Sequence, residues 1–89
     1  MTEASPYDVI IHPFVTEKTM AMMERENKLE FLVHRTANKP SIRKAVESLF
    51  DAKVEQVNIK IGRDGQKHAI VKFAPETKAE DVGTRIGIF

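Results

Sequence analysis

Alternating apolar and polar residues mark the expected strands of this chain. In KLEFLVH, residues 28–34, one face is strongly apolar because it carries Leu29, Phe31 and Val33. Residues 57–73, VNIKIGRDGQKHAIVKF, alternate in the same way on both sides of a turn. DVII, at residues 8–11, is a short apolar run that Pro13 is expected to end. The pattern therefore predicts four strands.

A different periodicity predicts the helices. After Asn38, apolar residues recur at i, i+3, i+4, i+7 and i+8, namely Ile42, Ala45, Val46, Leu49 and Phe50. Pro40 falls in the first turn of this helix, where a missing N–H costs nothing. Thr16 is expected to cap an earlier helix over EKTMAMMER, residues 17–25, and Asn27 is expected to end it.

The C-terminal residues 75–89 have weaker helical spacing, carried by Ala79, Val82 and Ile86. This pattern predicts a short helix or a helical turn interrupted at Gly83. The element order is then strand, helix, strand, helix, strand, strand and terminal helix. That order predicts an α+β fold in which helices pack on the apolar face of a small antiparallel four-stranded sheet.

The length of the turn within residues 57–73 decides which residues share a face of the sheet. A two-residue Asp64-Gly65 turn would mix apolar and charged residues on both faces. A three-residue loop, Arg63-Asp64-Gly65 with Gly65 left-handed, makes one face apolar by setting two apolar pairs opposite each other, Val57 with Val71 and Ile59 with Ala69. We therefore expect the three-residue loop. The second face then carries Asn58, Lys60, His68 and Lys72, and it is expected to be an open cationic surface.

Length and composition limit the class of protein. The 89 residues are expected to form a single domain, 1–89, with a modest core, and the absence of cysteine suits a reducing compartment. No apolar run approaches a membrane span, and residues 1–8 lack the pattern of a signal peptide, so we expect a cytoplasmic protein without membrane insertion. The 14 basic and 13 acidic residues nearly balance, but the segment 58–73 is strongly basic.

Catalytic chemistry has little support in the sequence. His12, His34 and His68 are far apart and lack the companions of a metal site or an acid–base pair. GRDG, at residues 62–65, matches the GXXG loop of KH domains, but it joins two expected strands rather than two helices. No phosphate-binding glycine motif and no RNA-recognition-motif strand occur. We expect no enzyme, no metal and no cofactor.

Several motifs, in order, resemble the ribosomal protein L23 family of the large subunit. They are TEK at residues 16–18, ANK at 37–39, IRKAVESLF followed by VEQVN at 42–58, and a final IGIF at 86–89. The resemblance covers about Ile10 to Phe89. It implies a protein without catalytic role that binds large-subunit ribosomal RNA near the polypeptide exit tunnel, beside neighbouring ribosomal proteins. It also implies docking of nascent-chain factors, namely the signal recognition particle and the protein-conducting channel.

The expected RNA-binding residues combine this resemblance with the second sheet face. Phosphate contacts dominate affinity for nucleic acids, so Lys60 and Lys72 on an uncovered face are expected to bind phosphate. Asn58 could read a base edge or a 2′-hydroxyl, or could fix its strand. The full expected set is Thr16, Lys18, Asn38, Lys39, Asn58, Lys60, Arg63, Lys67, His68 and Lys72.

The expected docking residues are implied by resemblance alone. Glu17 stands in the TEK motif, where an acidic residue also suits the helix dipole. Phe50 and Asp51 resemble a second part of the docking surface, although Phe50 also fits the apolar stripe of its helix.

Two features resemble the archaeal form of the family. Bacterial members carry a long loop between the last two strands, whereas Arg63 to Gly65 is a tight turn here, which argues against contact with the nascent chain inside the tunnel. Eukaryotic members carry a long basic extension, whereas residues 1–8 are short and acidic. The alternative to a ribosome-bound protein is a small α+β protein-interaction or ligand-sensing domain that uses its free sheet face.

Overall fold

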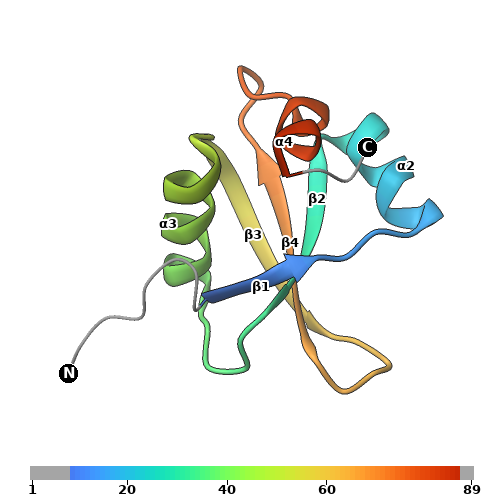
Figure 1. The fold of residues 1–89 in the computed structure, drawn as a ribbon, viewed down its shortest axis with the longest axis vertical. Coiled ribbons are helices and arrows are strands. Elements are labelled where there is room, and N and C mark those ends of the chain that lie inside the picture. Colours follow the sequence, from blue (N-terminus) through green and yellow to red (C-terminus); the bar gives the residue numbers. More distant parts are fainter. Residues whose placement is uncertain (1–8, 87–89) are drawn as a thin grey trace.

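The computed structural model describes residues 9–86 (Figure 1). Its elements follow in the order β1 (Ile10–Pro13), α2 (Glu17–Glu26), β2 (Lys28–Val33), α3 (Lys39–Phe50), β3 (Val54–Ile61), β4 (Lys67–Phe73) and α4 (Ala79–Ile86). The four strands form an antiparallel sheet in the order β1-β2-β4-β3. The predicted α+β class and the predicted order of elements are confirmed.

The hairpin of β3 and β4 has the register that the apolar pattern predicted. Its apolar pairs are Val57 with Val71 and Ile59 with Ala69. Three residues, Arg63-Asp64-Gly65, form the loop, and Gly65 has a φ of 77°. Glycine adopts this left-handed conformation without a steric penalty because it has no Cβ. The three-residue loop is therefore confirmed.

Reciprocal hydrogen bonds cap the N-termini of both predicted helices. At α2, the Thr16 hydroxyl accepts from the Thr19 N–H (3.2 Å) and the Thr19 hydroxyl accepts from the Thr16 N–H (2.7 Å). At α3, Asn38 and Ser41 exchange the equivalent bonds at 2.9 and 3.0 Å. Each capping box satisfies two N–H groups that a helix start otherwise leaves unpaired.

Two predicted boundaries are wrong. Strand β1 begins at Ile10 and runs through Pro13 instead of ending before it. Because β1 is an edge strand, Pro13 can lie in it without removing a hydrogen bond from the sheet, although proline has no N–H. Helix α4 continues through Gly83, where an interruption was predicted. Glycine inside a helix costs about 1 kcal/mol, but the burial of Ala79, Val82 and Gly83 on one side of α4 outweighs this cost. Asp8 and the motif residues 87–89 lie outside the described residues.

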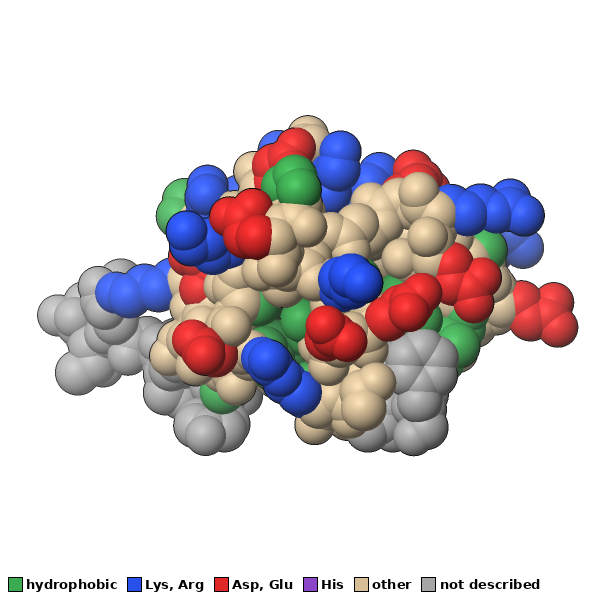
Figure 2. All heavy atoms as spheres, turned by 90° about the horizontal axis from the view of Figure 1, so that it is seen from above, with side chains coloured by type: hydrophobic (Ala, Val, Ile, Leu, Met, Phe, Trp, Pro, Cys, Tyr) green, Lys and Arg blue, Asp and Glu red, His purple; other side chains and the backbone are tan. Residues whose placement is uncertain are grey.

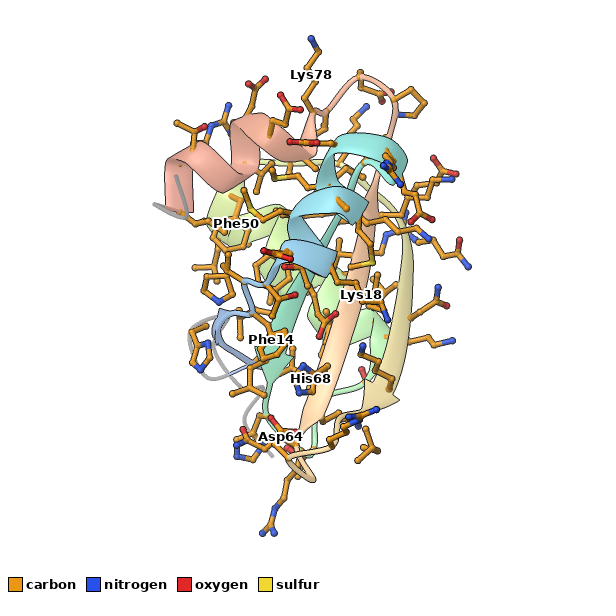
Figure 3. The ribbon with its side chains drawn as sticks, turned by 90° about the vertical axis from the view of Figure 1, so that its right-hand side faces the viewer. Phe14, Lys18, Phe50, Asp64, His68 and Lys78 are labelled. Atoms are coloured by element: carbon orange, nitrogen blue, oxygen red, sulfur yellow. The ribbon has the colours of Figure 1, made fainter. Side chains whose placement is uncertain are left out.

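The main core lies on the apolar face of the sheet. Phe31, Val71 and Phe73 from the strands meet Ile42 of α3 and Val82 of α4 there, all at most 1% exposed. Helix α2 lies on the other side of the strands from α3 (Figures 1 and 3) and contributes Met23 to the same core.

The second face of the sheet is covered over β2 and open over β3. Glu30 and Leu32 of β2 are buried, Ile70 and Lys72 of β4 are half-buried, and Asn58 of β3 is exposed. Helix α2 crosses in front of β2 in Figure 3, while β4 and β3 lie beside it. The expectation of a wholly open second face is therefore wrong for its β2 half.

A single side chain joins the ends of three elements at the upper end of the sheet. Asn27 ends α2 in the left-handed conformation, with a φ of 59°. Its amide nitrogen lies 3.2 Å from the Phe73 carbonyl and 2.8 Å from the Thr77 carbonyl. Its amide oxygen accepts from the Ala79 N–H at 2.7 Å, where α4 begins. Asn27 was predicted only as a helix end, and it also fastens β4 and α4.

Replacing Asn27 tests this junction. Asn27→Gly keeps the left-handed backbone but leaves the amide partners unpaired, so we expect a loss of about 2 kcal/mol in the free energy of unfolding. Asn27→Ala adds the left-handed penalty and should lose roughly 1 kcal/mol more. Urea unfolding measures both variants, with Asn58→Ala on the exposed face as the control. An Asn27→Gly variant as stable as the control would contradict the assignment.

Candidate nucleic-acid interface

One end of the molecule collects basic residues from two loops. Arg63 lies in the β3–β4 turn, and exposed Arg35 lies in the loop between β2 and α3. Both loops lie at the lower end in Figure 1. The Lys67 ammonium connects them because it donates to the carbonyls of Ala37 (2.6 Å) and Arg35 (3.3 Å). We call this region the basic end, which comprises Arg35, Lys39, Lys60, Arg63 and Lys67.

The opposite end carries charges of both signs. Figure 2 shows acidic and basic side chains interspersed there. Several of them form ion pairs, namely Lys28 with Glu26 (3.2 Å), Lys53 with Glu76 (3.8 Å) and Lys72 with Glu55 (3.8 Å). Within residues 9–86, by contrast, the side chains of Arg35, Lys39 and Arg63 have no ion-pair partner. Arg25, Lys78 and Arg85 also form no ion pair within this range, but acidic residues lie near them in the sequence. In the two loops of the basic end, however, Asp64 is the single acidic residue, so positive charge is in local excess there.

The open part of the second face carries three of the expected RNA-binding residues. Asn58 and Lys60 are exposed on β3, and Lys72 is half-buried on β4. Lys60 lies opposite His68, four residues along β4 from Lys72. The two lysines are therefore about 13 Å apart along the strands, since each residue advances roughly 3.3 Å. The structure spreads these residues along the face instead of joining them in a cluster.

His68 is buried among carboxylates instead of lying on the open face. It is 2% exposed, and its Nδ1 lies 2.9 Å from Oε2 of Glu30, which is 3% exposed. The Phe14 ring packs edge-on against the imidazole, with ring centroids 4.8 Å apart (Figure 3). The expectation that His68 lies on the cationic surface is wrong, because the segment leading into α2 covers it.

The β3–β4 turn completes the surroundings of His68. Nε2 of His68 lies 3.3 Å from both carboxylate oxygens of Asp64. Asp64 also accepts the Gln66 N–H at 2.9 Å, and this bond, supported by His68, holds the pKa of the Asp64 carboxyl below its ordinary value of 3.8. A Cβ on Gly62 would fall 2.6 Å from His68 Nε2, so the turn requires glycine there to make room for the ring.

The expected residues at the two helix starts have local structural roles. The side chains of Thr16 and Asn38 serve as the caps described above. Lys18 is exposed on the first turn of α2, on the side of the molecule that carries His68 and Phe14 (Figure 3). Lys39 is the first residue of α3, which has no acidic residue in its first turn.

Two of the three expected docking residues, Phe50 and Asp51, border an open apolar groove, whereas Glu17 is exposed on the first turn of α2 and does not line it. The groove, of about 520 Å³, is lined by Phe50 and Asp51 at the end of α3 and by residues of β1 and α4 that include Pro13 and Ile86. The Phe50 ring is half-buried and stacks on Phe31, with centroids 5.6 Å apart. Asp51 is exposed in a left-handed conformation, with a φ of 49°. Phe50 therefore contributes both to the core and to the groove.

Two residues of this region had no role in the expectations from sequence. Arg35 stands beside His34 shortly before the ANK motif, and this local concentration of positive charge is a signal that sequence could have offered. Glu30 alternates with apolar residues in β2, which is the usual pattern of a solvent-facing position. Nothing near Glu30 in the sequence indicates that Phe14 and His68 enclose it.

Residues 9–86 contain no group of three histidine or acidic side chains placed to hold a metal ion. In the same range, no helix has the length and apolar character needed to cross a membrane. The fold and the basic end describe a small α+β protein with a localised cationic surface.

Comparison with known proteins identifies the family. The family model of ribosomal protein L23 matches residues 8–80. The large ribosomal subunit protein uL23 of Picrophilus torridus is 54% identical over 82 residues, which cover 92% of this chain and 99% of that protein. The uL23 proteins of Thermoplasma acidophilum and Methanothermobacter thermautotrophicus are 51% and 45% identical, over 92% and 94% of this chain and 96% and 98% of their own lengths. The chain belongs to the ribosomal protein L23 family.

Membership confirms the predicted family and its archaeal type, because all three relatives are archaeal. The chain is a ribosomal protein, so the predictions of a non-enzymatic role and of a ribosome-bound, cytoplasmic location are confirmed as well. The alternative of a free-standing interaction or sensing domain is set aside.

The lowered pKa of Asp64 predicts how its contribution to stability depends on pH. A carboxyl whose pKa is lower in the folded state stabilises the fold above its ordinary value of 3.8 and loses that effect as the pH falls through the folded value. Asp64→Asn keeps an oxygen for the Gln66 N–H but removes the charge. We expect wild type to be more stable than the variant at about pH 6, and the difference to vanish towards about pH 2.

Urea unfolding of wild type and Asp64→Asn across this pH range measures the effect. Glu24→Gln, on an exposed position of α2, serves as the control for removal of a surface charge. A difference that stays constant with pH would show that the Asp64 charge does not stabilise the turn.

Proposed function

We propose that this protein is a constituent of the large ribosomal subunit and binds ribosomal RNA through the basic end and the open part of the second sheet face. Residues 1–89 would act as one RNA-binding domain, beside neighbouring ribosomal proteins. The observation that carries the proposal is that Arg35, Lys39 and Arg63 are exposed at one end of the molecule without ion-pair partners, where Asp64 is the single acidic residue of the two loops. Such cations bind phosphate without first breaking an internal ion pair, and phosphate contacts supply most of the affinity for RNA.

The residues of the basic end have different tasks in this proposal. Arg35, Lys39 and Arg63 are exposed and contact phosphates directly. Lys67 directs its ammonium to two backbone carbonyls, so it holds the loop that presents Arg35 and Lys39. Lys67 thus supports the interface from within, and a phosphate contact of its own is secondary.

The remaining expected residues extend the interface. Lys60, Lys72 and Asn58 continue it along the open face, and Lys18 adds a cation from α2. Thr16 and Asn38 shape the helix starts at which Lys18 and Lys39 stand. The start of α3 also suits a phosphate because helix N-termini attract anions and no acidic residue competes there.

Salt dependence tests the RNA interface. Lys39→Gln and Arg63→Gln should each lower the slope of log affinity against log salt by about 0.7–0.9, since each removes one phosphate contact. Lys72→Gln shows whether the footprint reaches the upper part of the face. Binding is measured with transcribed large-subunit ribosomal RNA of Thermoplasma acidophilum, one of the source organisms of the relatives.

Lys53→Gln is the matched control, because Lys53 is exposed at the opposite end and pairs with Glu76. It should leave the slope unchanged. Equal slopes for wild type, Lys39→Gln and Arg63→Gln would overturn the proposal that the basic end binds RNA.

We propose a second role for the groove residues Phe50 and Asp51 together with Glu17 of α2, namely docking at the tunnel exit for nascent-chain factors such as the signal recognition particle or the protein-conducting channel. The family resemblance suggests these partners, and the groove supports the role. Phe50 offers an apolar surface that its stacking on Phe31 holds in place, and Asp51 offers an adjacent charge. Glu17 is exposed, and within residues 9–86 its carboxylate has no ion-pair partner.

Glu17→Gln tests this docking role. The substitution keeps the side-chain shape, so incorporation into subunits should be unchanged. Affinity of the ribosome for the signal recognition particle should fall about two- to fivefold, as expected for one exposed charge pair. The loss should be larger at low salt, where screening is weakest. Glu24→Gln on the same helix should have no effect, and equal effects of the two variants would contradict a specific role for Glu17.

A further inference from the structure

The buried carboxylate of Glu30 lies between two basic side chains. Its Oε2 is 2.9 Å from His68 Nδ1, and its Oε1 is 3.4 Å from the Lys60 ammonium. The Glu30 and His68 side chains are each 3% exposed, whereas the Lys60 side chain is 45% exposed. Lys60 therefore connects an enclosed charge to the open face that is proposed to meet RNA.

His68 faces carboxylates with both of its ring nitrogens. Nδ1 faces Glu30 and Nε2 faces Asp64. A neutral imidazole can donate from only one nitrogen, whereas the imidazolium donates from both. The geometry accommodates the charged ring, and histidine is the side chain that ordinarily changes charge between about pH 5 and 8.

The charged groups around this centre come from few elements. Glu30 lies on β2, Lys60 on β3, Asp64 in the turn and His68 on β4. The segment before α2 contributes the uncharged ring of Phe14. Glu17 and Lys18, on the first turn of α2, are both exposed. Within residues 9–86, no other charged side chain forms an ion pair with Glu30 or His68.

The charge on His68 determines whether Glu30 retains Lys60 as its cationic partner. When His68 is charged, it neutralises Glu30 at the shorter distance, and the Lys60 ammonium can leave for another anion. When His68 is neutral, Lys60 is the remaining cation beside a buried carboxylate. Removing the last partner of a buried charge is costly, so Lys60 is then retained.

We propose that His68 and Glu30 are positioning residues that determine whether Lys60 is available to an RNA phosphate. RNA binding through Lys60 is then stronger when the His68 ring is charged than when it is neutral. The inference rests on the proposed RNA interface and adds to it a control that acts from inside the fold.

Salt slopes of RNA binding at about pH 5.5 and about pH 8.5 test the proposal, with the Thermoplasma acidophilum large-subunit ribosomal RNA as the probe. For wild type, the slope should be steeper at the lower pH by about 0.7–0.9, which corresponds to one additional phosphate contact. Lys60→Gln should abolish this difference. Urea unfolding at both pH values checks that the variant is folded, because the substitution also removes a partner of the buried Glu30 carboxylate.

Two interior variants should act in opposite directions. His68→Gln cannot become charged, so its slope should equal the high-pH wild-type slope at both values. Glu30→Gln no longer holds Lys60, so its slope should equal the low-pH slope at both values. If Glu30 and His68 had only a structural role, both variants would be less stable. The salt slope of His68→Gln would then not stay at the high-pH value, and that of Glu30→Gln would not stay at the low-pH value.

His34→Gln is the matched control, because His34 is an exposed histidine near the basic end whose ring bonds to Thr36 and not to Glu30. This variant should keep the pH-dependent change of slope. If wild type and Lys60→Gln change equally with pH, the inference fails. If Lys39→Gln and Arg63→Gln also leave the slope unaltered, the proposed RNA interface fails with it, so the two failures are distinguishable.

Discussion

The register of the β3–β4 hairpin is the constraint on which the rest of the structure depends. Because side chains alternate between faces, a shift of one residue would turn the apolar set of β4 towards solvent. The same shift would move His68 out of reach of Glu30. The three-residue loop fixes the register through the left-handed Gly65, and Gly62 leaves space for the imidazole. A few turn residues thus determine both the core face and the composition of the second face.

Those parts of the fold that depend on local pattern could be predicted from the sequence. The stripe of α3 and the caps at Thr16 and Asn38 are determined by residues within a turn or two of one another. The errors arose where tertiary context outweighed local preference. Pro13 continues a strand because it lies at an edge, and Gly83 remains helical because its side of α4 is buried.

The candidate site was predictable in its charge and less so in its geometry. Basic residues near the turn indicated where unpaired positive charge would gather, and Arg63 and Lys39 are exposed as expected. The direction of a long side chain is not a local property, however. Lys67 turns inward to backbone carbonyls of a loop some 30 residues away in sequence. His68 is enclosed by Phe14, which lies in the segment between β1 and α2, far from His68 in the sequence.

The hydrogen bonds of Asn27 have a consequence for the order in which the chain can fold during synthesis. The partners of its amide lie 46 to 52 residues downstream, beyond most of the sheet. Strand β2 likewise lacks its neighbour β4 until the chain has been made as far as Phe73. The chain is made from its N-terminus, so α2 and β2 are present before α3 and β3 are added. During that time the Asn27 amide and the β4-facing edge of β2 have no partners. Closure of the sheet and docking of α4 are therefore late steps, and the entropy of a long loop must be lost before they are completed.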